Sequence, residues 1–225
     1  MPNACDREDC RCPEPDESVS VWHVVISGFT QHRGDPTGSQ KLWLKLRSLV
    51  APKGGQAVEF FGWKSNWNQI AEWIWRCRPQ DRPPLVYIYA YSWGAGWGFT
   101  QLARELRKRG IRVRRAVLCD PVYRSGLLGF CWLAISRLVR PVIVAPANVD
   151  WLWYCYQSFD RWPNPRGHKV VAEDPAETVI CNPRELVRTH HYMDDSAEWQ
   201  DMAAGVARSA RPAPAYEASR LQETP

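Results

Sequence analysis

A serine, an aspartate and a histidine in separate parts of the chain have the side-chain types that nucleophilic acyl transfer needs. Ser92 stands in the frame AYSWG, Asp120 follows 28 residues later, and His190 lies near the C-terminal end. A serine hydroxyl is a weak nucleophile unless an imidazole takes its proton and a carboxylate orients that imidazole. The order Ser, Asp, His is the one expected when such a site is built on strands alternating with helices.

The frame around Ser92 is typical of a sharp turn from a strand into a helix. A nucleophilic serine at such a turn needs small residues two positions before and two positions after it, and Ala90 and Gly94 meet this need. The frame departs at Ala90 from the commonest pattern, which has glycine there. The alternative interpretation is that Ser92 merely caps the following helix.

The two partners of the serine are expected at the same edge of the sheet. Asp120 follows the apolar run 116–119, so a parallel strand would carry its carboxylate to that edge. His190 and the adjacent His191 stand in a late segment between the last strand and the last helix, from which either imidazole could reach the serine. In the alternative reading, Asp120 before Pro121 starts an ordinary turn and the histidines are exposed loop residues.

Apolar runs of strand length alternate with helical patterns along the chain. The expected strands are 21–27, 57–61, 85–91, 113–119, 168–172 and 177–181. Apolar residues at helical spacing follow several of these runs, and a last helix carries the apolar residues of 199–206. This alternation predicts an α/β fold with a mostly parallel central sheet and helices on both faces.

The length of 225 residues suits one sizeable domain, which we expect at 19–208. An irregular, aromatic-rich region at about 123–165 is expected to form a cap. The acidic residues 1–18 and the Ala/Pro/Arg-rich residues 209–225 lack periodicity, and we expect both segments to be disordered.

Aromatic side chains concentrate in the second half of the expected cap. They are Trp151, Trp153, Tyr154, Tyr156, Phe159 and Trp162. They could form an apolar pocket for an acyl or aryl group, with residues 127–133 as a lid, or they could pack as core.

Cysteine usage favours a reducing compartment and hence a cytoplasmic protein. Five cysteines stand among apolar or element-forming residues, as reduced core cysteines do. They are Cys77, Cys119, Cys131, Cys155 and Cys181. The N-terminal segment is polar and acidic, unlike a signal peptide, and no apolar run is long enough to predict a membrane span.

The remaining cysteines and the charge predict neither a metal site nor a nucleic-acid partner. Cys5, Cys10 and Cys12 resemble part of a metal site, but no nearby residues complete a tetrahedral set. The net charge is +5, and much of the basic charge lies in 104–109 and 112–115, where a solvated helix end and strand edge account for it. No nucleic-acid-binding module accompanies this charge.

Together these features resemble the α/β-hydrolase superfamily, in particular its small lipase-like or thioesterase-like members from bacteria and phages. The matching segments are SGF at 27–29, AYSWGAG at 90–96, LCDPV at 118–122, PANV at 146–149 and HHYMDD at 190–195. The resemblance covers about residues 20–208, the whole expected domain. In this chain the acid follows the strand directly after the serine turn, as it does in some family members.

The resemblance implies a role for each residue of the site. Ser92 would be the nucleophile, His190 the general base and Asp120 the orienting acid, with His191 as the alternative base. His190 is preferred because family loops often read His-x-x-Ile/Met-Asp, which the segment HHYMDD matches from its first histidine. The oxyanion hole would use the backbone N–H groups of Phe29 and Trp93.

The expected protein is a cofactor-free serine hydrolase that acts on an ester or thioester of a small or lipid-like acyl substrate. Two alternatives stay open at this point. One is a binding protein that has the fold without the activity, since a fold does not determine a function. The other is an acyltransferase that uses the same three residues. The sequence does not indicate the oligomeric state.

Overall fold

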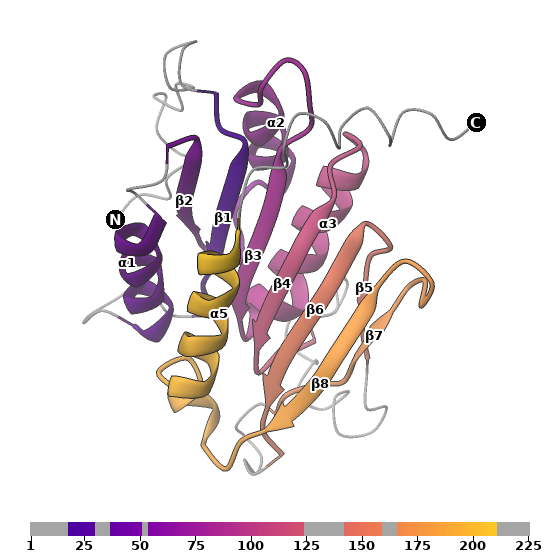
Figure 1. The fold of residues 1–225 in the computed structure, drawn as a ribbon. Coiled ribbons are helices and arrows are strands. Elements are labelled where there is room, and N and C mark those ends of the chain that lie inside the picture. Colours follow the sequence, from indigo (N-terminus) through magenta and orange to yellow (C-terminus); the bar gives the residue numbers. More distant parts are fainter. Residues whose placement is uncertain (1–17, 30–36, 51–53, 124–141, 159–165, 211–225) are drawn as a thin grey trace.

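The computed structural model describes residues 18–29, 37–50, 54–123, 142–158 and 166–210. At its centre lies a six-stranded sheet with the strand order β2-β1-β3-β4-β6-β8, in which every pair of neighbours is parallel (Figure 1). The strands are β1 (Val21–Ile26), β2 (Gln56–Phe61), β3 (Leu85–Tyr91), β4 (Val113–Cys119), β6 (Val149–Tyr156) and β8 (Val179–Glu185). A separate parallel pair consists of β5 (Ile143–Ala145) and β7 (Val170–Ala172).

Helices cover both faces of the central sheet, which confirms the predicted α/β class. The helices are α1 (Gly38–Val50), α2 (Trp67–Arg76), α3 (Phe99–Arg107) and α5 (Ala197–Ser209). Leu46 of α1 and Trp199 of α5 belong to the apolar core on one face, while Ile74 of α2 and Leu102 of α3 belong to the core on the other. Because both faces are covered, β1 is apolar throughout except for one histidine, and all of its residues are buried.

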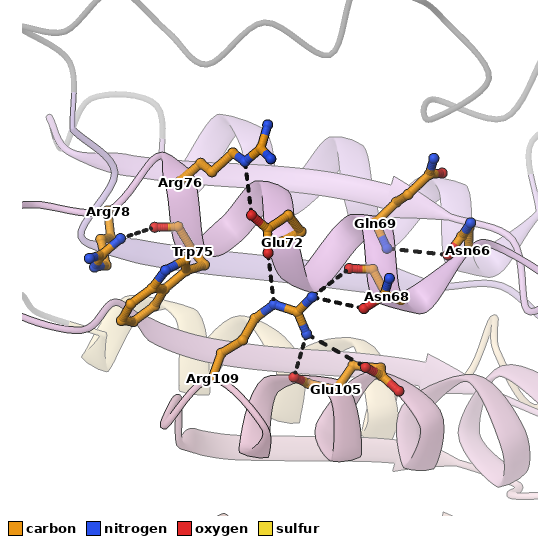
Figure 2. A network of polar contacts seen from close by, with 9 residues as sticks. All are labelled: Asn66, Asn68, Gln69, Glu72, Trp75, Arg76, Arg78, Glu105 and Arg109. Carbon is orange, nitrogen blue, oxygen red and sulfur yellow. Dashed lines mark hydrogen bonds and ion pairs between the residues drawn. The ribbon is translucent and has the colours of Figure 1, made fainter.

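A side-chain cap begins α2, and an arginine links α2 to α3 on the same face of the sheet (Figure 2). Asn66 accepts a hydrogen bond from the backbone N–H of Gln69 and so satisfies the first turn of α2. Arg109, just after α3, donates to Glu72 at 3.2 Å and to the side chain of Asn68 at 2.8 Å. This member of the basic run therefore joins two helices.

The aromatic segment expected in the cap instead contributes a strand to the central sheet. Residues 149–156 form β6, which lies between β4 and β8. Within this strand Trp151 stacks on Trp153, at a ring distance of 6.2 Å, and Tyr154 is buried in the apolar core. Aromatic residues favour strands as much as caps, which explains the difference.

The other residues of the expected pocket, Phe159, Trp162 and the lid at 127–133, lie outside the described residues. The same is true of most of the two terminal segments, 1–18 and 209–225. Their predicted disorder and the predicted lid stay predictions.

One cysteine differs from expectation. Cys77, directly after α2, is disulfide-bonded, whereas Cys119, Cys155 and Cys181 are free thiols. The prediction of a reduced Cys77 is therefore wrong, because apolar neighbours surround buried thiols and buried disulfides alike. Cys77 therefore gives no support to a reducing compartment, and the cytoplasmic location stays a prediction. Within the described ranges, no helix combines the length and apolar character that crossing a membrane requires.

Candidate active site

Ser92 occupies a tight turn directly after β3, as its sequence frame predicts. Its φ is 54°, a left-handed conformation that residues other than glycine seldom adopt. Main-chain bonds hold it: the Ser92 N–H donates to the carbonyl of Cys119 at 3.0 Å, and the Ser92 carbonyl accepts from Val122 at 3.1 Å and from Gly96 at 2.9 Å. The serine turn is thus fastened to the end of the neighbouring strand β4.

A close approach of two backbones behind the serine explains the glycine at position 96. Gly96 lies in a single turn of π-helix, η1 (Gly94–Gly98), between Ser92 and α3. A Cβ atom at this position would overlap the carbonyl oxygen of Val122. Only glycine lets the segment after Asp120 pass this close to the serine turn.

His190 stands between Ser92 and Asp120 and makes a hydrogen bond to each. Its Nε2 lies 2.9 Å from the Ser92 Oγ, and its Nδ1 lies 2.6 Å from Oδ2 of Asp120. A carboxylate accepts and does not donate, so Nδ1 holds the proton and Nε2 is left to accept from the serine hydroxyl. All three side chains are buried. The structure therefore brings together the three residues named from the sequence.

The histidine segment is anchored at His190 and again at Asp194. The Tyr91 hydroxyl donates to the His190 carbonyl at 2.6 Å, and the two rings stack with centroids 5.1 Å apart. Four residues later, the Asp194 carboxylate accepts from the backbone N–H of Ser39 at 3.1 Å, in the first turn of α1. His191 is exposed, and its ring stands edge-on to His190 at 5.9 Å. The imidazole that contacts the serine is that of His190.

Asp120 is held after β4 by groups in and directly after β6. It has φ of 42°, its N–H donates to the carbonyl of Cys155 at 2.7 Å, and its carboxylate is fully buried. Gln157 donates to both carboxylate oxygens, from its backbone N–H at 3.0 Å and from its side-chain amide at 3.2 Å. Gln157 was not predicted to belong to the site. Its one available signal is its place after β6, because residues that follow parallel strands meet at one edge.

Phe29 and Trp93, the expected oxyanion donors, lie beside the serine. Gly28 is so close that a Cβ there would stand 2.9 Å from the Ser92 Cβ. The ring of Phe29 lies 4.5 Å from that of Trp93, which in turn lies 4.7 Å from Trp63. Trp63 was not predicted to belong to the site. The use of these two N–H groups as an oxyanion hole stays a prediction.

The thiols behind the site are not equipped to act as nucleophiles. Burial raises the pKa of Cys119 well above its usual range and raises the pKa of Cys155 to about 11. Both groups therefore keep their protons at neutral pH, and a protonated thiol is a poor nucleophile. The Ser92 hydroxyl, in contrast, lies within hydrogen-bond distance of the His190 Nε2.

Across the part of the chain that the structure describes, no three His, Cys, Asp or Glu side chains are grouped as a metal site would require. Cys5, Cys10 and Cys12 fall outside that part.

Comparison of the chain with models of protein families and with curated proteins finds no match.

Proposed function

We propose that the protein is a serine hydrolase of the α/β-hydrolase type, which cleaves an ester or thioester through an acyl-enzyme on Ser92. The observation that carries this proposal is the unbroken hydrogen-bonded chain from the Ser92 Oγ through His190 to Asp120, with distances of 2.9 and 2.6 Å. The position of the serine on a strained turn between a parallel strand and a helix supports the same function.

In the proposed reaction, His190 Nε2 accepts the hydroxyl proton while the Ser92 Oγ attacks the acyl carbon. The buried Asp120 carboxylate stabilises the imidazolium that forms and keeps its Nδ1 proton in place. His190 then gives the proton to the departing alkoxide or thiolate, and the acyl-enzyme remains. In the second half, His190 takes a proton from water while the water oxygen attacks the acyl carbon. The bond between that carbon and the Ser92 Oγ then breaks, His190 returns the proton to Oγ, and the carboxylic acid leaves.

The negative oxygen of the tetrahedral intermediate needs donors that are already in place. The backbone N–H groups of Trp93 and Phe29 are the proposed donors, because one follows the nucleophile and the other follows the strand beside it. The exposed part of the Phe29 ring, supported by Trp93 and Trp63, offers an apolar surface next to the serine. This surface favours an apolar acyl or aryl group as substrate.

The test is labelling of the folded protein with a fluorophosphonate, which reacts with activated serines. Wild type should label, Ser92→Ala should not label, and His190→Ala should label far more slowly because the hydroxyl has lost its base. The matched control is Ser196→Ala, which removes another buried serine, the N-cap of α5. It should keep the label despite losing about 1 kcal/mol of stability.

Two results would count against the proposal. If folded wild type takes no label, the result contradicts the hydrolase and favours a binding protein with this fold. If Ser92→Ala labels as wild type does, the nucleophile is another residue. An acyltransferase would label in the same way, and product analysis with and without an added alcohol or amine acceptor distinguishes it from a hydrolase.

A further inference from the structure

Gln157 holds the buried carboxylate of Asp120 through two hydrogen bonds. It directly follows β6 and is fully buried. Its backbone N–H donates to Oδ1 at 3.0 Å, and its side-chain Nε2 donates to Oδ2 at 3.2 Å. A single residue therefore contacts both oxygens of the acid.

The surroundings leave the carboxylate little room to rotate. The backbone N–H of Gly167 donates to the Gln157 carbonyl at 3.2 Å, which fixes the backbone of Gln157 in turn. Gly167 also passes so close that a Cβ there would overlap Oδ1 of Asp120. The next residue, His168, donates its N–H to the carbonyl of Pro121 at 2.7 Å. The segment 167–168 is thus packed against the acid and bonded to the residues on either side of it, Pro121 and Gln157.

The side-chain amide of Gln157 and the imidazole of His190 donate to the same oxygen, Oδ2 of Asp120. The position of this oxygen determines where the Nδ1 of His190 lies, and hence where Nε2 faces the serine. A buried carboxylate also needs donors to compensate for the lost contact with water. The amide meets both needs, because it holds Oδ2 in place and stabilises its negative charge.

We propose that Gln157 is the positioning residue of the site, and that it acts through Asp120 to set the position of the His190 imidazole. Gln157 donates to Asp120, and its contact with the site is made through that carboxylate. The kinetic consequence of this role rests on the proposed function. The hydrogen bond between His190 and Asp120, which Gln157 controls, exists whether or not the protein is an enzyme.

The test uses the full-length protein and two substitutions that preserve the size of the side chain. Gln157→Met removes the amide donor and keeps the backbone N–H. Gln157→Glu keeps the shape and places a carboxylate where the amide donates. The matched control is Asn148→Leu, because Asn148 is also a buried amide that makes two hydrogen bonds, to the carbonyls of Ala103 at 2.9 Å and Ile111 at 3.0 Å. Asn148 precedes β6, at the edge of the sheet opposite the site.

Two readouts separate positioning from mere support of the fold. The first is the proton NMR signal of His190 Nδ1–H, which lies far downfield when this proton makes a short hydrogen bond to a carboxylate. The signal is assigned with Asp120→Asn, in which it should disappear. The second is the split between kcat and KM for a p-nitrophenyl ester, with thermal melting as the check on folding. We expect both Gln157 variants to shift or broaden the signal and to lower kcat by about 10-fold or more, the scale of one charged hydrogen bond, with KM little changed. Asn148→Leu should melt earlier and leave signal and kcat unchanged.

The proposal is overturned if Gln157→Met and Gln157→Glu keep both the wild-type NMR signal and the wild-type kcat. It is also overturned if Asn148→Leu alters them as much as the Gln157 variants do, because the effect would then follow stability alone. If wild type has no activity, the proposed function fails by itself. The NMR signal then decides for or against the role of Gln157.

Discussion

Ser92 and Asp120 are joined through their main chains at the ends of neighbouring strands, and both have positive φ, 54° and 42°. The N–H of Ser92 binds the carbonyl just before Asp120, and the N–H of Val122 binds the carbonyl of Ser92. A shift of the Ser92 turn would therefore move the Asp120 turn. The nucleophile and the acid are held by one main-chain hydrogen-bond network, while the imidazole comes from a separate segment.

The two adjacent histidines should differ sharply when each is replaced. His190→Ala removes the group 2.9 Å from the Ser92 Oγ, and we expect kcat for an ester substrate to fall by about 10⁴-fold or more. His191→Ala removes an exposed ring and should leave kcat near wild type. Steady-state kinetics with both variants checks this. A larger loss in His191→Ala would mean that the segment rearranges to present the other imidazole.

Gly96 and Gly205 offer a paired test of the close approach behind the serine. Gly96→Ala would push the new methyl group into the carbonyl of Val122, so we expect a loss of about 1–3 kcal/mol in the free energy of unfolding, together with lost activity. Gly205→Ala, in α5 with open space at its Cβ, should gain about 0.5–1 kcal/mol. Urea denaturation measures both. Equal free energies of unfolding for the two variants would show that the backbone around Gly96 can move to make room for a methyl group.

Phe29 should influence which acyl chains are accepted. Phe29→Ala removes the apolar surface beside Ser92, and we expect kcat/KM for a p-nitrophenyl octanoate to fall about 10-fold while that for the acetate changes little. Leu44→Ala is the control, because Leu44 is as exposed as Phe29, at 52%, but lies on α1. An equal loss of kcat/KM with both esters would mean that Phe29 acts on the reaction step and does not recognise the acyl chain.

The pH dependence of cysteine alkylation follows from the raised pKa values. With a pKa of about 11, Cys155 holds on the order of 10⁻³ of its thiol as thiolate at pH 8. Iodoacetamide should therefore modify the partly exposed Cys181 first and leave Cys119 and Cys155 unmodified, with no loss of fluorophosphonate labelling. Peptide mapping by mass spectrometry shows the order. Because each pH unit below the pKa changes the thiolate fraction about tenfold, modification of Cys155 should rise from pH 8 to pH 10. Fast modification at pH 8 contradicts this prediction.

The interior of the sheet was largely predictable from the sequence. The strands β1 and β3 are buried on both faces, and burial on both faces favours the nearly continuous apolar runs that predict them. In β4 the run is apolar only after Arg115, and Arg114 is exposed. The strand β6 lacked this signature, because its tryptophans and tyrosines also suit a cap. Only its pairing with β4 and β8 shows that it belongs to the centre. The strand β8 extends into polar residues and includes Pro183, which an edge strand tolerates.

The three reactive residues of the site were predictable from the sequence, but the residues that hold them in position were not. Ser92, Asp120 and His190 have side chains whose chemistry and order can be recognised in a linear chain. Gln157 belongs to no motif, and its role depends on two hydrogen bonds that exist only after folding. The choice of His190 over His191 likewise depends on the turn at 190–192, which points the first ring toward the serine.

The hydrogen bond from the Tyr91 hydroxyl to the His190 carbonyl bears on how this site could be transplanted. Tyr91 ends the strand that precedes Ser92, yet its hydroxyl binds the segment that carries His190. One phenol therefore joins two parts of the site that are distant in the sequence. A designer who copied only the three reactive side chains into another scaffold would leave this tie behind, along with the amide of Gln157. The smallest unit that can be moved as a whole therefore comprises the three side chains and the two neighbours that hold them in register.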